Sequence, residues 1–238
     1  MNLRCFFYLL MLPCLAGETV TTEFPDPGRP GLLTIDLELP KVRLVITGHR
    51  ESRVIARLSM ADGPTGSPMV SFTDKDNQKT LHLDPACRGD LDLEIMVPLQ
   101  TSLAVELQNG STITVAGVHG DHEIGIKQGH IHMTGIRGSA VMAVNQGTMR
   151  VSFDAVDETK AMSFVAYKGD IEVTFPAEIR AEIKLTVNRC NIDSDFALDG
   201  KQRLRREQHA KPWTTIVNGG GSPIRFTLNT GNLRLLKK

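Results

Sequence analysis

Five stretches of the chain decide its fold, because each repeats one spacing of apolar residues around a central position. They are IGIKQGHIHM at 124–133, MAVNQGTMRV at 142–151, FVAYKGDIEV at 164–173, LTVNRCNIDS at 185–194 and FTLNTGNLRL at 226–235. Apolar residues lie five and three residues before the centre. They recur two residues after it and, except at Ser194, four residues after it. Internal repeats of this length predict a stacked architecture.

The central positions are Gly129, Gly147, Gly169, Cys190 and Gly231, and Gly110 begins the series with one extra residue before its apolar pair. Neighbouring positions are 18 to 22 residues apart, except for a gap of 41 before Gly231, which is close to two periods. Glycine suits a tight corner because it adopts positive φ without steric cost. Each period is therefore expected to supply two short strands joined at such a corner.

One turn of this kind cannot bury its own apolar face, so successive turns are expected to stack about 4.8 Å apart around a shared core. The sequence thus predicts an all-β fold, a parallel β-solenoid (β-helix-like) with turns of roughly 20 residues over residues 108–238. Alternating apolar residues between 33 and 46 and short apolar runs up to residue 97 indicate further strands. We expect residues 17–107 to form an irregular β cap on the solenoid.

The residues between the inward positions are expected to form a solvated outer face. After the corners they are His130 and His132, Thr148 and Arg150, Asp170 and Glu172, Asn191 and Asp193, and Asn232 and Arg234. Arg150 and Glu172 would lie in neighbouring turns, where they could form an ion pair.

Composition narrows the function classes. The formal net charge is zero and charged residues make up 23% of the chain, which disfavours a nucleic-acid partner, since such binders usually carry a basic excess. Aromatic residues are only 5%, with one Trp, which disfavours extended stacking platforms for sugars or bases.

The first 16 residues resemble an export signal, with Arg4 before an apolar run and small residues ahead of a cut after Ala16. The apolar run is too short for a stable membrane span, and no long one follows Val20, so no transmembrane segment is expected in the mature chain. An uncleaved anchor or a wrong start site is the alternative, and Pro13 before Cys14 disfavours a lipoprotein. The chain is expected to be periplasmic, extracellular or at the cell surface.

The mature chain would keep two cysteines, Cys87 and Cys190, which are disulfide candidates in an oxidising compartment. Two unrelated thiols, one of them in the core, are the alternative. A basic excursion at 199–212 interrupts the repeat and is expected to be a solvated loop, or a contact for an anionic polymer or phospholipid headgroup. Trp213 is expected to re-attach the chain to the stack.

The chain from residue 91 onward resembles a family of proposed bacterial adhesins with β-strand repeats, catalogued as a domain of unknown function. The resemblance lies in LDLEIMVP at 91–98, QNGSTITVAGVHGD at 108–121, YKGDIEVTFP at 167–176 and NTGNLRLL at 229–236. LTIDLELPKVRLVITG at 33–48 also matches that family's N-terminal strands. The resemblance implies a parallel β-helix-like fold and extracytoplasmic placement. Cys190 at a glycine position and the basic excursion depart from it.

Histidines give a weak metal signal. His130 and His132 would share one outward strand face, a spacing that can serve a metal, with Asp121 as a possible third ligand. A polar face that happens to use histidine is the alternative. No cofactor is expected, because the sequence has no P-loop, HExxH or Gly-x-Ser-x-Gly motif.

Carboxylate pairs at Asp170 and Glu172, and at Asp193 and Asp195, raise the alternative of a glycan-active β-helix enzyme. Interspersed Arg and Asn favour cross-turn pairing instead, and short turns leave little material for a cleft. We therefore expect a non-enzymatic, adhesin-like binding or scaffold protein of the cell envelope, with a surface polymer or envelope protein as partner. A structural element that self-associates through exposed solenoid ends is the third alternative.

Overall fold

The computed structural model describes residues 18–26, 28–60, 70–84, 90–198 and 212–238, and these form thirteen strands and no helix. The strands are β1 Glu18–Glu23, β2 Gly31–Leu37, β3 Val42–His49, β4 Arg53–Met60, β5 Val70–Lys75, β6 Gln78–Leu83, β7 Leu91–Pro98, β8 Thr101–Ala116, β9 His119–Val156, β10 Met162–Phe175, β11 Ala181–Ser194, β12 Trp213–Val217 and β13 Pro223–Lys237. All belong to one mixed, mostly parallel sheet. The predicted all-β class is confirmed.

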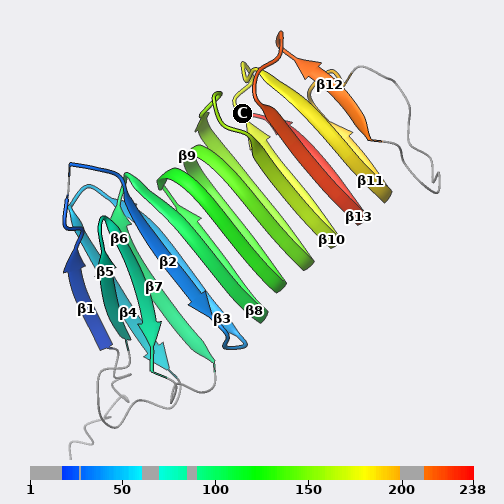
Figure 1. Cartoon of the computed structure of the whole chain (residues 1–238). Coiled ribbons are helices and arrows are strands. Elements are labelled where there is room, and N and C mark those ends of the chain that lie inside the picture. The colour runs from blue at the N-terminus through cyan, green and yellow to red at the C-terminus, as the bar shows by residue number, and fades with distance from the viewer. Residues whose placement is uncertain (1–17, 27, 61–69, 85–89, 199–211) are drawn as a thin grey trace, which may run out of the picture.

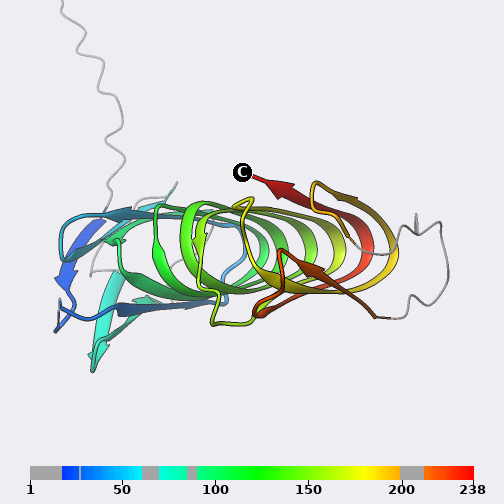
Figure 2. The ribbon, with the colours of Figure 1, turned by 90° about the horizontal axis from the view of Figure 1, so that it is seen from above.

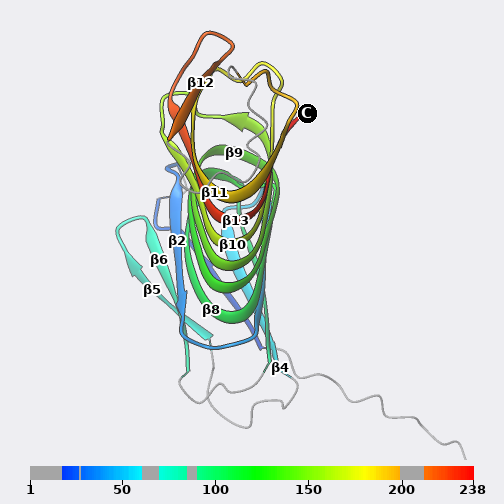
Figure 3. The same cartoon turned by 90° about the vertical axis from the view of Figure 1, so that its right-hand side faces the viewer.

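The long strands bend into two limbs, which lie side by side in a stack (Figures 1 and 3). The limb before each corner runs in the order β5, β6, β2, β8, β9, β10, β13, β11, β12. The limb after each corner begins with β1, β4, β7 and β3 before it reaches β8. We call the outward side of the first limb face A and that of the second limb face B.

Inward residues of both limbs form one continuous core, as the repeat predicts. The apolar residues five positions before the corners are all buried: Ile124, Met142, Phe164, Leu185 and Phe226. Aromatic rings continue through neighbouring layers, since the Phe164 and Phe226 rings stack with centroids 5.1 Å apart. Burial of this column across layers holds the stack together, because no single turn could bury its own apolar side chains.

Corner glycines form a column through four layers: Gly129, Gly147, Gly169 and Gly231. The carbonyl oxygen of each lies where a Cβ on the next glycine of the column would be. A Cβ at Gly147 would lie 1.7 Å from the oxygen of Gly129, and one at Gly169 would lie 1.6 Å from that of Gly147. Their φ angles of 142° and 147° belong to a region that only glycine adopts readily. Gly110 lies beside the column, in the bulge that shifts the register between β8 and β9.

The order of the last layers differs from the order of the repeats along the chain. Sequence spacing places Cys190 directly after Gly169 in the stack, but β13 lies between β10 and β11. Gly231 is therefore the register partner of both Gly169 and Cys190. The expectation of consecutive layers is wrong at this point.

The glycine column explains this order. A Cβ at position 231 would lie 1.6 Å from the oxygen of Gly169, so the layer stacked on β10 must present glycine at the corner. Cys190 carries a Cβ and takes the next layer, where its φ is not positive. The same order stacks Phe226 on Phe164.

Antiparallel strands cover both ends of the first limb. β12 pairs with residues 181–185 of β11, and β5 pairs with β6. The buried Lys79 of β6 lies at the N-terminal end of the core. Its Nζ lies 2.6 Å from Asp74 Oδ1 and donates to Thr22 Oγ1 at 2.9 Å. On the second limb, β1 pairs antiparallel with β4. These outermost strands are only five or six residues long, which limits the open edge that they leave for end-to-end pairing.

A third side links the two limbs of successive turns, so the chain coils when seen from above (Figure 2). The amide of His119 donates to the Leu99 carbonyl at 2.7 Å, and that of Asp157 donates to the Gly138 carbonyl at 3.0 Å. Hydrogen bonds therefore connect layers on this side as well.

Several expectations concern residues outside the described ranges. The export signal at 1–16, Cys87 and residues 199–211 of the basic excursion belong to this group. Among the described residues, none forms a helix of the length and apolarity needed to cross a bilayer. β8 runs without interruption through the predicted boundary at 107/108, and that domain division stays a prediction.

Replacing Gly169 by Ala is expected to cost more than about 3 kcal/mol of the free energy of unfolding, because the methyl group collides with backbone that cannot move away. Urea denaturation followed by circular dichroism measures this loss.

Gly117→Ala is the matched control. Gly117 also has positive φ, at 64°, but its Cβ would meet no atom within 4 Å. Its cost should stay at about 1 kcal/mol, the usual penalty of left-handed backbone. Equal losses for the two variants would show that backbone φ, and not the stacked carbonyl, makes glycine necessary.

Candidate binding face

Face B presents polar side chains at matching positions of four stacked layers, on β9, β10, β13 and β11. The row nearer the corner, called the inner row, is in stack order Thr148, Asp170, Asn232 and Asn191. The next row, two residues further along each strand, is Arg150, Glu172, Arg234 and Asp193. These are the outward residues that the repeat predicts. Strand pairing fixes their spacing at about 4.8 Å between layers.

Glu172 is the centre of the charged row. The predicted pair with Arg150 is confirmed, with Nε 3.8 Å from Oε1. The inserted strand β13 adds a second partner, because Arg234 Nη1 lies 3.3 Å from Oε2. Glu172 is thus held between two guanidinium groups, an arrangement that the linear order of repeats could not reveal.

The inner row is joined by amide and carboxylate groups. Asn232 donates to Asp170 Oδ1 from its backbone at 2.9 Å and from its side chain at 2.7 Å. Asn191 in turn donates to Asn232 Oδ1 at 3.0 Å. Asp170 and Glu172 are therefore engaged in cross-layer contacts, as the sequence favoured.

A hollow of about 480 Å³ lies over these two rows. Its lining includes Arg150, Asp170, Glu172, Asn232 and Arg234. The exposed edges of the guanidinium and amide groups leave donors and acceptors toward solvent. Such a surface suits shallow hydrogen bonding to an extended, hydroxyl-rich or acidic ligand.

The two histidines of the metal hypothesis extend face B by one layer. Both are exposed, and His130 Nδ1 lies 2.7 Å from Thr148 Oγ1. Within the described ranges, no three His, Cys, Asp or Glu side chains gather where a metal could bind. Asp121, the suggested third ligand, instead contacts Lys160. A metal at His130 and His132 stays a prediction.

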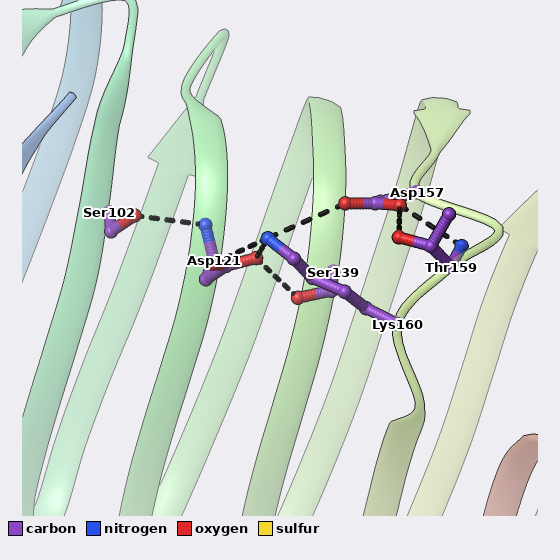
Figure 4. Close-up of polar contacts among 6 residues, drawn as sticks. All are labelled: Ser102, Asp121, Ser139, Asp157, Thr159 and Lys160. Atoms are coloured by element: carbon purple, nitrogen blue, oxygen red, sulfur yellow. Dashed lines mark hydrogen bonds and ion pairs between the residues drawn. The ribbon is translucent and has the colours of Figure 1, made fainter. Parts of the chain in front are cut away.

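Asp121 belongs to a separate polar cluster, shown in Figure 4. Lys160 Nζ lies 2.9 Å and 2.8 Å from its two carboxylate oxygens and 3.4 Å from Asp157 Oδ2. Ser139 donates to Asp121 Oδ1 at 2.7 Å. Burial pushes the pKa of Asp121 upward, but hydrogen bonds from Lys160 and Ser139 outweigh it, so this pKa lies below its ordinary value. The cluster links three layers, and its side chains are engaged in contacts with one another.

His122 was assigned no place in the core from the sequence, although it shares the parity of the inward Ile124. The side chain is only 2% exposed and lies beside Leu103 in the core. Neither ring nitrogen has a hydrogen-bond partner, since the nearby Val118 backbone falls short of that geometry. Burial lowers the pKa of His122 to about 4, and the weaker opposing effects of Val118 and Asp121 do not restore it.

Cys190 is buried and forms no disulfide among the described residues, where its Sγ lies 3.2 Å from the Leu228 carbonyl oxygen and donates to it. Burial raises the pKa of this thiol. Its pairing with Cys87 stays a prediction, as Cys87 lies outside the described residues. Trp213 begins β12 and packs against the core, so it re-attaches the chain after the excursion as expected.

Solved structures align with this chain over nearly its full length. A proposed cell adhesion protein from Clostridium sporogenes is 12% identical, with a TM-score of 0.47, and the match covers 94% of this chain and 100% of that one. A proposed adhesin from Bacteroides fragilis is 10% identical, with a TM-score of 0.36 and coverage of 95% and 99%. A proposed adhesin from Parabacteroides merdae is 9% identical, with a TM-score of 0.28 and coverage of 93% of each chain.

No protein-family model matches the sequence, and no curated protein matches it significantly. The resemblance expected from the strand motifs is confirmed as a likeness to structures of proposed bacterial adhesins. At these identities and TM-scores the likeness identifies neither a ligand nor an activity.

His122 is expected to make the protein acid-sensitive. Its pKa is lower in the folded state than the ordinary 6.5, so the unfolded chain binds more protons below pH 6.5. The free energy of unfolding is therefore not reduced by His122 above pH 6.5, and it should fall by about 3 kcal/mol as the pH drops to 4. Urea midpoints at pH 7, 6, 5 and 4 measure this slope.

His122→Leu is the informative comparison. Leucine removes two unpaired buried nitrogens, so the variant should be about 1–3 kcal/mol more stable at pH 7 and should have a flatter pH profile. His130→Leu, at an exposed position, should change neither quantity. A destabilised His122→Leu protein with an unchanged profile would contradict the assignment.

Proposed function

We propose that the chain is an exported, non-enzymatic β-solenoid that acts as an adhesin-like binding or scaffold protein of the cell envelope. Face B would bind an extended surface polymer, such as an anionic or hydroxyl-rich glycan. The observation on which the proposal rests is the pair of polar rows over the 480 Å³ hollow, built from four layers in register.

Regular spacing supports a polymer as the ligand. A chain lying across the layers would meet equivalent positions in successive strands, so each contact can be weak while the sum is specific. Arg150 and Arg234 offer donors that fit carboxylate or sulfate groups bidentately. Asn191 and Asn232 offer amides to hydroxyl groups.

Coiling supports the solenoid description. The corner glycines stack directly, and backbone hydrogen bonds link layers on the third side, as between His119 and Leu99. The apolar run and small residues at 1–16 support export, and cleavage after Ala16 would release the mature chain.

The glycan-active enzyme is the alternative from another class. It needs a carboxylic acid and a carboxylate free to act across a glycosidic bond. On face B, Asp170 and Glu172 are instead matched by Asn232, Arg150 and Arg234. A structural element joined through its ends is the other alternative, and the short outermost strands at three of the four limb ends disfavour it.

A glycan array probed with residues 17–238 tests the proposal, and we expect binding to one class of acidic or hydroxyl-rich polymer. Calorimetry with that polymer should then show about tenfold weaker binding for Arg234→Ala, the loss of one charge-assisted contact.

Arg137→Ala is the control, because Arg137 is an exposed arginine on the third side, away from face B. It should bind like the wild type. The absence of any array ligand, or equal losses for both variants, would contradict face B as the binding surface. Release of reducing sugar from a bound glycan would favour the enzyme.

A further inference from the structure

Face A differs from face B in the way its side chains are distributed. Face B alternates charges that pair across layers, whereas face A separates them along the stack. Acidic residues gather toward the N-terminal layers, apolar residues lie at the centre, and basic residues lie toward the C-terminal layers. The outward residues that carry this pattern are, in stack order, Asp36, Glu106, Glu123, Gly125, Val141, Ala143, Val165, Tyr167, Thr227, Arg225 and Lys184. Two outward charges run against it, Lys127 in the acidic layers and Glu182 in the basic layers.

The centre of face A is an exposed apolar patch. Val141 is 48% exposed, Val165 is 37% exposed and Tyr167 is 60% exposed. Ala143 is the register partner of Val165 and is exposed as well, so the patch is continuous across β9 and β10. Three of the four exposed large apolar side chains of the described chain therefore meet in one place. Contiguous exposed apolar surface of this kind marks an interaction site.

The acidic end is a cluster of like charges. Asp36 and Glu106 are register partners on β2 and β8, and Glu123 lies in the next layer. None of these three carboxylates forms an ion pair within the described ranges. Burial and the neighbouring charges of Asp36 and Glu123 raise the pKa of Glu106, and the opposing charge of Lys127 offsets them only in part. Like charges in adjacent strands destabilise a sheet unless an external cation compensates them.

The basic end supplies such cations. Arg225 on β13 is exposed and has no ion-pair partner in the described part of the chain, and its register partner on β11 is Lys184. Lys184 lies 3.2 Å from Glu182 and keeps two further hydrogens for another acceptor. Glu106 leans toward the centre, because its Oε2 would lie 1.9 Å from a Cβ at Gly125.

We propose that face A is the contact surface of a symmetric dimer, with a second copy of this chain as its partner. A two-fold axis that runs parallel to the strands, between Ala143 and Val165, reverses the order of the layers and keeps the rows in register. It brings Ala143 of one copy against Val165 of the other. The same rotation brings Glu123 of one copy opposite Arg225 of the other, next to Gly125 where the Glu106 carboxylate lies. Lys184 then lies opposite Ala104, two residues from Glu106.

Self-complementarity is the reason to choose a second copy as the occupant. A two-fold contact uses the same patch twice, so it requires complementary charges on opposite sides of an apolar centre. Face A has this antisymmetric arrangement, and face B does not. The six layers from β8 to β11 present roughly 30 × 15 Å, or about 900 Å² over both copies, which predicts a weak, reversible dimer.

Dimerisation through face A leaves face B exposed on both outer sides, because the limbs pack against each other through the core. The dimer would therefore present two polar faces in opposite directions. A bivalent particle of this kind can cross-link polymer strands and gains avidity without a new contact.

Sedimentation equilibrium of residues 17–238 at low ionic strength tests the proposal. We expect a monomer–dimer equilibrium with a dissociation constant on the order of 10–100 µM, weakened by 0.5 M NaCl because charges contribute. Val165→Lys should weaken dimerisation at least tenfold. Thr47→Lys, at an exposed face B position, should leave it unchanged.

Complementary charge reversal tests the proposed charge contacts between the two copies directly. Glu123→Lys and Arg225→Glu should each weaken dimerisation about tenfold, because each creates two like-charge contacts in the symmetric dimer. Mixing the two variants should restore the wild-type dissociation constant to within about threefold, since the mixed dimer contains two opposite-charge contacts. Melting curves of each variant verify folding.

A wild-type chain that stays monomeric at 300 µM would overturn the proposal. So would a mixture of the charge-reversed variants that associates no better than either alone, or Val165→Lys and wild-type chains with equal association. These outcomes concern face A only. Loss of glycan binding through face B is measured separately on Arg234→Ala.

Discussion

Close contact between the corner glycines is the constraint on which the rest of the structure depends. Each layer places a carbonyl oxygen within 2 Å of the position that a Cβ would occupy in the next layer, as at Gly147 and Gly169. Only glycine tolerates this approach together with its positive φ. The corner fixes the register, and the register aligns the inward residues of both limbs into a continuous core.

The same constraint accounts for what the sequence could and could not predict. Strands, corners, inward residues and the Arg150–Glu172 pair follow from spacing, because a period-2 pattern determines which side chains turn inward. The position of β13 does not follow, since spacing gives the order along the chain and not the order in space. Cys190 is the sequence feature that indicates this order, because a residue with a Cβ cannot follow Gly169 in the column.

Chemistry was harder to predict than architecture, for reasons visible at individual residues. His130 and His132, with Asp121 as a third ligand, suggested a metal site. Lys160, 39 residues further along the chain than Asp121, is instead the partner of that carboxylate. His122 could have been placed by its parity with Ile124, yet its lack of any hydrogen-bond partner depends on three-dimensional surroundings. Ligating or catalytic roles rest on such contacts, which one-dimensional patterns do not contain.

The two outward faces have different physical characters although they share the same strands. Face B joins its charges across layers, which leaves a nearly neutral, hydrogen-bonding surface suited to a polymer. Face A separates its charges around an apolar centre, which suits a second copy. A stack of this kind can thus divide ligand contact and self-association between its limbs, because alternate residues of each strand face outward independently of the core.

Cysteine cross-linking tests most directly whether the glycine column sets the order of the layers. In a Glu172→Cys, Arg234→Cys chain the two positions are register partners in adjacent strands, within the Cα separation that a disulfide bridges. In a Glu172→Cys, Asp193→Cys chain they are two layers apart, about 10 Å, which is too far. After mild oxidation, peptide mapping should find the 172–234 link and no 172–193 link. A 172–193 link without the other would place β11 next to β10 and contradict the account.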